Sequence, residues 1–399
     1  MKHDFRVLLV TNAYFPRIGG ITEYLELLVG GLGGLGIPTE VLAMPEEFNR
    51  LDEEARGFKI WWRTIHLVFV GAFALYAIGR IAKALRKPGP LIVHSHSASY
   101  CLVVGLIAKM LGSHAIHTFH SPLSEASPLL RVAASRLDAL VFVSRALGDQ
   151  GASLGIKNAH RVLIPTAVDM ARFHPPSPDE RRDASKSLER YFEKTAAAGP
   201  TILFVGRIVP EKGVDVLLEA LERVFKLLPK ARAVIVGPFD LSKRGRQFQE
   251  SCRALIRRYP LDGRVAMLGS INDSGLLACY WAADVLVCPS TWPEPAAIVV
   301  SEGMACALSV VASSVGGLGE RVDDKVTGFL VPPGNPDSLA ERILGVLQVP
   351  DRAASFGEQG RSKVVRELGS DLMVRRHVDL YAGMVTLPNQ EHRQESKHG

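Results

Sequence analysis

The sequence predicts an α/β protein made of two doubly wound domains, each with a parallel β-sheet between layers of helices. Three observations support this fold class. The chain has 399 residues, which exceeds the about 250–300 residues at which a single hydrophobic core stops growing. Short β-branched runs alternate with helix-length amphipathic stretches, as in βαβ units. The alternation breaks off near the middle of the chain and then restarts, as expected for a second Rossmann-like domain.

The first domain is predicted over residues 1–175. Its five expected strands are short apolar or β-branched runs at Arg6–Val10, Thr39–Ala43, Leu91–His94, Ala115–Thr118 and Leu140–Val143. Helical patterning follows each of them. Between Thr22 and Leu35, for example, apolar side chains recur at three- and four-residue intervals and form one stripe.

A linker is predicted over residues 176–199, because prolines crowd the start of this stretch and mixed charges follow. The second domain then spans 200–369, with expected strands at Thr201–Val205, Ala233–Val236, Arg264–Leu268, Asp284–Cys288 and Leu308–Ala312. Helical patterning returns over residues 370–387. The tail 388–399 is predicted to be disordered.

The composition argues against several classes of protein. Apolar residues make up 47% and charged residues 22% of the chain, as in ordinary globular domains. The net charge of +6 favours anionic substrates or an anionic membrane surface, but no arginine-rich helix or zinc-finger spacing indicates nucleic acid. The five cysteines are scattered in mostly apolar runs, which favours buried thiols in a reducing compartment. Because the start also lacks a secretory-signal pattern, we expect a cytoplasmic protein.

The segment Ile65–Ile78 carries no Asp, Glu, Lys or Arg. It is shorter than the about 20 apolar residues that a membrane-spanning helix needs. Tryptophans before it and basic residues after it are typical of helices that lie on a bilayer, namely Trp61, Trp62, Arg80, Lys83, Arg86 and Lys87. The pattern fits a buried core helix and, equally, peripheral contact of residues 61–87 with the inner face of a membrane.

Two glycines, Gly19 and Gly20, stand between the first expected strand and the helix after it. Glycine at this point lets the backbone approach a ligand, and the first amides of the helix can bind an anion. The pair also fits an ordinary tight turn, since it forms no complete G-x-G-x-x-G pattern.

Two cations, Arg207 and Lys212, lie between the strand that ends near Val205 and the helix that starts near Gly213. Open α/β sheets bind ligands at the carboxyl ends of their strands, and two cations there suit a diphosphate. Either cation alone would indicate only a solvated surface.

Two acids, Glu294 and Glu302, are separated by seven residues. Glu302 is predicted in the helix that Glu294 precedes, so that both carboxylates can face one ligand. Sugar hydroxyls are well-matched donors for buried carboxylates. The alternative is an acid at a helix N-terminus followed by an exposed second glutamate.

His120 follows an expected strand, at the same end of the sheet as Ser95 and His96. The grouping of these three polar residues at one end of the sheet favours a functional interpretation of His120 over a structural one. No metal site is predicted, because the histidines lack the usual carboxylate or cysteine neighbours. Histidines within or before strands are interpreted as structural, namely His94, His114 and His117.

Taken together in order, these motifs resemble those of the family-4 retaining glycosyltransferases of GT-B architecture. The resemblance covers nearly the whole chain and includes the Gly-Gly loop, the HTFH histidine, G-R-x-x-x-x-K-G at 206–213, E-x7-E at 294–302 and the later segments ADVLVCPS and TGFLVPPGNPDSLA. It implies two Rossmann-like domains facing across a cleft. The first would take the acceptor and the second the nucleotide sugar, with the helix 370–387 crossing back to the first domain.

The resemblance also implies roles for single residues. The implied catalytic residues are His120, beside the sugar, with Arg207, Lys212 and Glu294. The two cations would hold the donor diphosphate, and Glu294 would bind hydroxyls of the donor sugar. Donor binding would further involve Gly19, Gly20, Glu302 at the ribose, and the backbone around Ala297, Ile298 and Val299.

The implied reaction is transfer of a hexose from a nucleotide diphosphate sugar to a glycan or lipid-linked acceptor, with retention and without a metal or other cofactor. Most of the acceleration would come from positioning and from preorganised cations. A role in cell-envelope or exopolysaccharide biosynthesis follows from the same resemblance. Uridine and guanosine donors fit the motifs equally.

Two departures from the family pattern stand beside the expected site. Where E-x-F-G is usual, the chain reads Glu294-Pro295-Ala296-Ala297, and where M-A-x-G-x-P is usual, it reads MACALS from Met304. These changes support an alternative function, a catalytically weak nucleotide-sugar-binding scaffold subunit of a polysaccharide-assembly complex.

Overall fold

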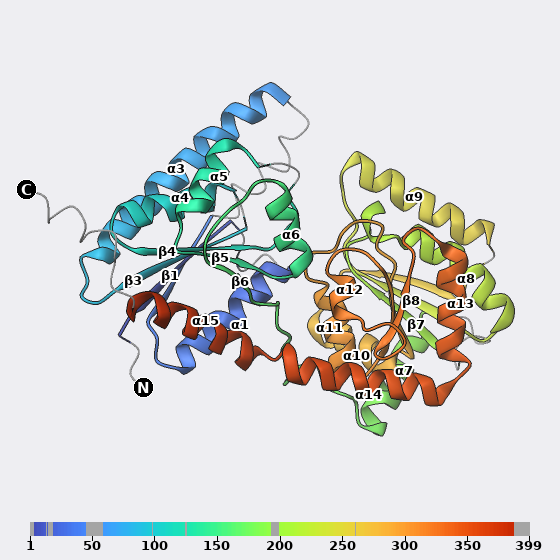
Figure 1. Ribbon diagram of the computed structural model, residues 1–399. Coiled ribbons are helices and arrows are strands. Elements are labelled where there is room, and N and C mark those ends of the chain that lie inside the picture. Colours follow the sequence, from blue (N-terminus) through green and yellow to red (C-terminus); the bar gives the residue numbers. More distant parts are fainter. Residues whose placement is uncertain are drawn as a thin grey trace, which may run out of the picture. The chain divides into compact units, whose positions relative to one another are not determined.

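The computed structural model describes residues 4–12, 14, 19–44, 59–97, 99–123, 126–192, 199–259 and 261–386, with the side chains of helix α3 (Lys59–Leu85) described from residue 71. The chain forms two compact units (Figure 1). The first combines Met1–Thr166 with Ser370–Gly399, and the second spans Ala167–Gly369. The tail 388–399, predicted to be disordered, lies outside the described residues.

The first unit is built on a six-stranded parallel sheet in the order β2-β1-β3-β4-β5-β6. Its strands are β1 (Arg6–Thr11), β2 (Thr39–Ala43), β3 (Leu91–His96), β4 (His114–Phe119), β5 (Ala139–Phe142) and β6 (Arg161–Leu163). The first five confirm the predicted strands. β6 is not predicted by the sequence pattern, because it is a three-residue strand with two exposed side chains and lacks an apolar run.

Helices cover both faces of this sheet. They are α1 (Gly20–Gly34), α3, α4 (Ser99–Met110), α5 (Pro128–Arg136), α6 (Arg145–Ser153) and α15 (Ser370–Thr386). Figure 1 shows α3 and α4 on one face and α1 and α15 side by side on the other. The C-terminal helix α15 therefore belongs to the first unit, as the resemblance implied, although the whole second unit intervenes in the sequence.

The described part of α3 has a buried side and an apolar outer side. Phe73, Ala77 and Ile81 are buried in a core cluster on the first sheet. Leu75 and Tyr76, in contrast, are 72% and 54% exposed. The tryptophans 61 and 62, expected as membrane anchors, lie outside the described side chains. Among the helices of the described part, none combines the length and apolar character needed to cross a bilayer.

A series of hydrogen bonds fixes α15 to the first sheet, and the donor and acceptor of each bond can be assigned. His377 Nδ1 lies 2.8 Å from the Met373 carbonyl, which only accepts, so Nδ1 carries the proton. Burial lowers the pKa of His377 to about 4, so the ring is neutral and its Nε2 is an acceptor. The hydroxyl of Tyr24, 2.8 Å away, must therefore donate to Nε2.

The series continues through β4 and β3 and returns to α15. The Tyr24 hydroxyl is used as a donor, so the Thr118 hydroxyl donates to the Tyr24 oxygen. Thr118 then accepts from His94 Nε2 at 2.6 Å, which leaves His94 Nδ1 to accept from the Tyr381 hydroxyl at 2.7 Å. All of these side chains are fully buried. The network thus begins and ends on α15 and admits one arrangement of protons.

The second unit repeats the architecture with a parallel sheet in the order β12-β11-β10-β7-β8-β9. Its strands are β7 (Thr201–Val205), β8 (Arg232–Val236), β9 (Val265–Gly269), β10 (Val285–Cys288), β11 (Ser309–Ser313) and β12 (Gly328–Val331). Alternate side chains of β7 enter different cores: Ile202 and Phe204 one cluster, Leu203 the other. The five predicted strands are confirmed, and β12 is additional.

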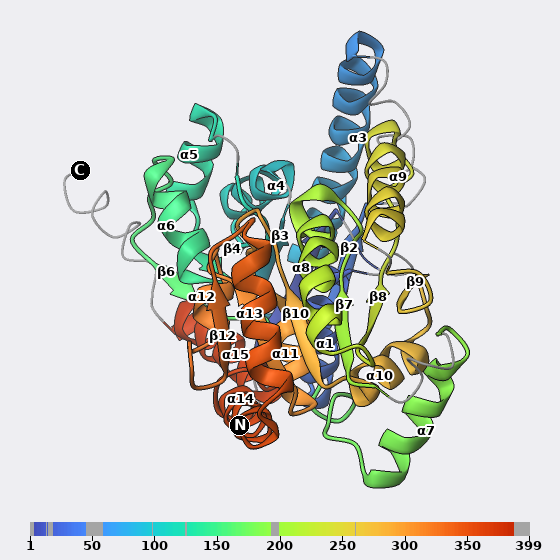
Figure 2. The same cartoon turned by 90° about the vertical axis from the view of Figure 1, so that its right-hand side faces the viewer.

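The helical elements of the second unit are α7 (Pro178–Glu189), η1 (Pro210–Lys212), α8 (Val214–Leu227), α9 (Lys243–Arg258), α10 (Asp273–Ala282), α11 (Ile298–Ala305), α12 (Leu318–Arg321), α13 (Pro336–Leu347) and α14 (Pro350–Glu367). Figure 2 shows α8 and α13 side by side over the second sheet. The connections that carry the expected site leave the carboxyl ends of β7 and β10.

The predicted linker 176–199 differs from the structure, which divides the two units after Thr166. Residues 178–189 form α7, which packs on α10 within the second unit. The prolines stand at the start of this helix and do not mark a linker. Pro178 occupies the first turn of α7, and Ser177 and Glu180 form a reciprocal capping box. Proline crowding therefore marks a helix start at this point.

Candidate functional site

The pair Lys212 and Glu294 forms the centre of the candidate site. Lys212 ends η1, and its Nζ lies 2.6 Å from Oε1 of Glu294. The loops that carry them are tied together, because the Thr291 amide donates to the Glu211 carbonyl at 3.0 Å. Gly213 follows with φ 67°, and a Cβ there would collide with the Pro289 carbonyl. Glycine is thus required where the two loops meet.

Glu294 is held on several sides. Its side chain is buried, and Ser290 donates its hydroxyl to the same Oε1 at 2.7 Å. Its backbone carbonyl accepts from the Gly317 amide at 2.6 Å. Sequence reasoning missed both partners. Ser290 lies two residues after the end of β10, so its place at the carboxyl end of a strand was the available signal.

Glu302 lies in α11 and is 4% exposed. The Tyr280 hydroxyl, from α10, donates to its Oε2 at 2.6 Å. This finding is against the alternative of an exposed second glutamate. Tyr280 is 22 residues away in sequence, and no motif indicated it.

Arg207 follows β7 on the same connection as Lys212 and is exposed. The loop is anchored by the Ile208 amide, which donates to the Pro238 carbonyl at 2.9 Å. Among the described residues, the Arg207 guanidinium forms no hydrogen bond or ion pair. Its charge contributes to the lowered pKa of Asp240, although the amide and hydroxyl of Ser242 are the main causes. The guanidinium is therefore accessible to an anion.

His120 lies in the first unit at the end of β4 and is 7% exposed. Its Nε2 is 3.1 Å from Nδ1 of His96, and the Tyr24 ring meets it edge-on at 4.6 Å. Burial, followed by the nearby His377, lowers the pKa of His120 to about 3, so the ring is neutral at neutral pH. Ser95 does not join this pair: its hydroxyl bonds to the Ile116 carbonyl, because neighbouring residues of a strand point to opposite faces.

Gly19, which precedes α1, is not required to be glycine by the packing of the described residues. Gly20 begins the helix, and Gly19 caps it in an extended conformation with φ 168°. Among the described residues, a Cβ at Gly19 would have no neighbour within 4 Å. The role of Gly19 and Gly20 in donor binding stays a prediction.

Two family models together cover most of the chain. Residues 18–172 match the model described as Glycosyltransferase Family 4, and residues 188–363 match the model described as Glycosyl transferases group 1. The chain is a family-4 glycosyltransferase. The predicted family and enzyme class are confirmed.

Known relatives include lipid glycosyltransferases. The chain is 27% identical to a GDP-mannose-dependent alpha-(1-6)-phosphatidylinositol monomannoside mannosyltransferase of Mycobacterium tuberculosis, over 95% of this chain and 98% of that protein. It is 25% identical to a phosphatidylinositol N-acetylglucosaminyltransferase subunit of Arabidopsis thaliana, over 85% and 73% of the two chains. A glycosyltransferase structure from Rickettsia africae ESF-5 superposes with a TM-score of 0.78, at 21% identity over 96% and 100% of the chains. The last likeness is one of fold, and it agrees with the predicted GT-B class.

The glycosyltransferase keeps alanine at two backbone positions that favour glycine. Ala297 has φ 48° and Ala307 has φ 59°, both in the left-handed region. These are the positions at which the sequence departs from the family's glycines. The departures preserve the backbone turn and place strain in it instead.

Replacing Ala307 with glycine is expected to raise the free energy of unfolding by about 1 kcal/mol, because an L-residue costs about 1–2 kcal/mol in this conformation. Urea denaturation measures the change. The matched control is Ala354→Gly, at an exposed right-handed position in α14, which should lower stability by about 1 kcal/mol. Equal destabilisation by both substitutions would contradict the strain at Ala307.

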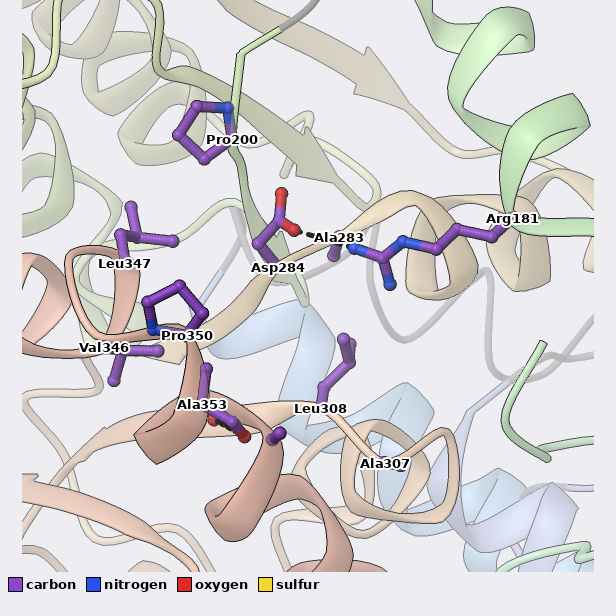
Figure 3. Close-up of a pocket in the computed structure, with 12 residues that line it drawn as sticks. Arg181, Pro200, Ala283, Asp284, Ala307, Leu308, Val346, Leu347, Pro350 and Ala353 are labelled. Carbon is purple, nitrogen blue, oxygen red and sulfur yellow. Dashed lines mark hydrogen bonds and ion pairs between the residues drawn. The ribbon is translucent and has the colours of Figure 1, made fainter. Parts of the chain in front are cut away.

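A pocket of ≈ 290 Å³ lies at the opposite end of the second sheet from Lys212 and Glu294. It is lined by residues just before β7 and β10, by the first residue of β11 and by the start of α14. Figure 3 shows Arg181 reaching from α7 to Asp284, and their atoms are 2.7 Å apart. Asp284 also accepts from the Thr201 amide. These contacts hold α7 against the sheet, and the pocket lacks the paired cations expected to bind the diphosphate of a donor.

In the described part of the chain, no group of three or more His, Cys, Asp or Glu side chains is arranged to hold a metal ion.

Proposed function

We propose that this glycosyltransferase transfers mannose from GDP-mannose to an inositol-phosphate lipid, with retention at the anomeric carbon and without a metal. The names of both relatives specify phosphatidylinositol-based acceptors, and one specifies GDP-mannose. The observation that carries the proposed nucleotide-sugar site is the contact of Lys212 with Glu294 at the carboxyl ends of β7 and β10. The choice of GDP-mannose as the donor rests on the relative's name.

The two cations are suited to the donor diphosphate. An ammonium has three N–H donors, and Glu294 uses one of those of Lys212. The others can bind phosphate oxygens. The accessible Arg207 guanidinium supplies up to five further donors and a fixed charge. In the proposed mechanism, both groups stabilise the charge that develops on the departing diphosphate.

The acidic side chains are assigned to the sugar and the ribose. Oε1 of Glu294 accepts from Lys212 and Ser290, whereas Oε2 makes no hydrogen bond within the described part of the chain. Oε2 can therefore accept from sugar hydroxyls. Glu302 is assigned to the donor ribose, as the resemblance implies.

The start of α11 offers further donors to the nucleotide sugar. The first amides of a helix have no acceptor within the helix, and Ala297 provides no side-chain cap. The amides around Ala297, Ile298 and Val299 are assigned to the donor sugar and phosphate. His120, neutral at neutral pH, is assigned to hydrogen bonding with the transferred sugar. The proton of the acceptor hydroxyl passes to an oxygen of the leaving phosphate.

An acceptor in a bilayer requires the enzyme to reach the membrane, and we assign this contact to α3. Its outer side presents Leu75 and Tyr76. The basic end of the helix follows. Two of the cations there, Arg80 and Lys87, pair with Glu40 at 3.0 Å each, while Lys83 and Arg86 remain exposed.

The double variant Leu75→Glu/Tyr76→Glu is expected to lower binding to vesicles that contain phosphatidylinositol by at least about tenfold. The reason is that burial of each apolar side chain in the bilayer would contribute about 1.5–3 kcal/mol to the free energy of binding. Both residues are exposed, so the melting temperature should not change. Flotation measures the binding. The matched control is Leu227→Glu, 56% exposed in the second unit. If the double variant and the control float like wild type, α3 is not the contact.

The function is tested with a panel of donors and acceptors. The purified protein is given GDP-mannose, UDP-glucose or UDP-N-acetylglucosamine together with vesicles of phosphatidylcholine, with or without phosphatidylinositol. Mannose is expected in the inositol lipid only. Turnover of a uridine donor alone would overturn the donor assignment. Binding of nucleotide without turnover of any donor would favour the scaffold subunit.

A further inference from the structure

The turn that joins Glu294 to α11 is held by α12 through two hydrogen bonds. Arg321, the last residue of α12, is 5% exposed, and its Nε donates to the Ala296 carbonyl at 3.0 Å. Gly317, the residue that caps the start of α12, donates its amide to the Glu294 carbonyl at 2.6 Å. One short element thus binds the carbonyls on both sides of Pro295.

The contact between α12 and this turn is backbone against backbone. A Cβ at Gly316 would lie 2.6 Å from the Glu294 carbonyl oxygen, and one at Gly317 would lie 2.7 Å from that of Pro295. Both approaches are too close for any side chain. Arg321 is therefore the side chain through which α12 holds the turn, while its glycines allow the approach.

The turn needs such an anchor because Ala297 is strained. Its φ of 48° and ψ of 50° place an L-residue in the left-handed region at the residue before α11. That conformation disfavours alanine over glycine by about tenfold in population. Strain of this kind persists where surrounding contacts determine the conformation, and it is found at ligand-binding turns.

We propose that Arg321 is a positioning residue for the nucleotide-sugar donor, whose guanidinium holds Ala296 so that Glu294 and the first amides of α11 are fixed before the donor binds. The proposal rests on the proposed function for the identity of the ligand. Nothing in the sequence motifs assigns Arg321 a role. Its contact reaches 25 residues back along the chain.

The guanidinium is suited to this task at working pH. Burial is the main cause that lowers the pKa of Arg321 to about 10, while Glu320 and Glu367 oppose the shift. The group therefore stays charged at neutral pH. A charged donor strengthens a hydrogen bond to a carbonyl in a buried setting.

Arg321→Met keeps the volume of the side chain and removes the hydrogen bond. The free turn would then occupy the binding conformation only part of the time, and apparent affinity falls by that fraction. We expect the dissociation constant for GDP-mannose, and its KM, to rise about tenfold. A saturating donor restores the conformation, so kcat should change by less than about threefold.

A second substitution separates positioning from simple loss of structure. Glycine adopts the left-handed conformation without strain. Ala297→Gly in the Arg321→Met background is therefore expected to restore most of the affinity that Arg321→Met loses. A defect of general folding would not be rescued by a change at Ala297. Arg232→Met is the matched control, because Arg232 is 3% exposed in the same unit and donates to Thr201 at the far end of the strands.

Calorimetric titration of the intact chain with GDP-mannose, and in parallel with UDP-glucose, measures the affinity of wild type and of each variant for the donor. Tenfold weaker binding by Arg321→Met with rescue by Ala297→Gly supports the proposal. Unchanged affinity of Arg321→Met for a donor that wild type binds overturns it and leaves the proposed function intact. If wild type binds neither donor, the proposed function and this proposal both fail. Should Arg321→Met not fold, Arg321→Leu, which also lacks a donor, and its Ala297→Gly partner are compared in the same way, and equal affinity of Arg321→Leu and wild type overturns the proposal.

Discussion

Lys212→Ala is expected to lower kcat/KM by about 10²–10³, the usual effect of removing one preorganised donor from the site of developing charge. The loss should fall mainly on kcat, because the charge on the diphosphate is greatest when the sugar departs. Steady-state kinetics with the preferred donor measure it. Stability should fall as well, by up to roughly 3 kcal/mol, since Glu294 is left buried with Ser290 as its remaining side-chain partner.

The control for this prediction is Lys226→Ala. Lys226 also pairs with a glutamate in the second unit, at 2.8 Å, but its side chain is 71% exposed. The substitution Lys226→Ala should therefore leave activity and stability unchanged. Glu294→Gln is expected to match the activity loss of Lys212→Ala. Full activity in either Lys212→Ala or Glu294→Gln would show that this pair is not the donor site.

The first unit is expected to become unstable in mild acid. Burial lowers the pKa of His117 and His120 to about 3 and of His377 to about 4. Burial also takes the pKa of His94 and His96 well below the usual value. These rings are neutral in the folded state, whereas unfolding would return them to a pKa of about 6.5. Between these values the unfolded state binds more protons, so the free energy of unfolding decreases as pH falls from 6.5 toward 4.

The size of the effect follows from the count of protons. Each histidine removes roughly 1 kcal/mol per pH unit over that window. For the three histidines with assigned values, the loss at pH 5 is roughly 4–6 kcal/mol, comparable with the total stability of about 5–15 kcal/mol of an ordinary domain. Hydrogen exchange at pH 7.5, 6 and 5 should show the first unit losing protection.

The second unit serves as an internal control, because it contains a single histidine, His174. Its protection should change little over the same range. His120→Gln should reduce the pH dependence of the first unit by about one proton. Parallel loss of protection in both units, or an unchanged slope in His120→Gln, would contradict the prediction.

The fold could be predicted where the sequence repeats one physical pattern. Every predicted strand has a parallel partner, and most of them are buried apolar runs that the sequence pattern alone located. β6 could not be predicted because two of its three side chains are exposed, so it has no buried apolar run. α7 could not be predicted because a proline such as Pro178 occurs at the start of a helix as well as in a linker.

The site could be predicted only as far as short motifs reach. Arg207, Lys212 and Glu294 lie in the connections after β7 and β10, and Glu302 lies in α11. The alternation of strands and helices brings these connections to one sheet edge. Their partners come from elsewhere: Tyr280 holds Glu302, and Arg321 holds Ala296. The bond of His377 to Tyr24 joins residues 353 positions apart. Such contacts depend on how helices pack, which no local spacing encodes.

The return of α15 to the first unit has a consequence for biosynthesis. The ribosome completes Met1–Thr166 well before Ser370 appears, since residues 167–369 must be translated in between. At about 5–20 residues per second, the delay is roughly 10–40 s. Throughout that time the hydroxyl of Tyr24 and the ring of His94 lack their C-terminal partners. Until the C-terminal segment emerges, the nascent N-terminal half therefore remains incompletely folded. The apolar surface that α15 covers in the complete first unit stays exposed to solvent during that time.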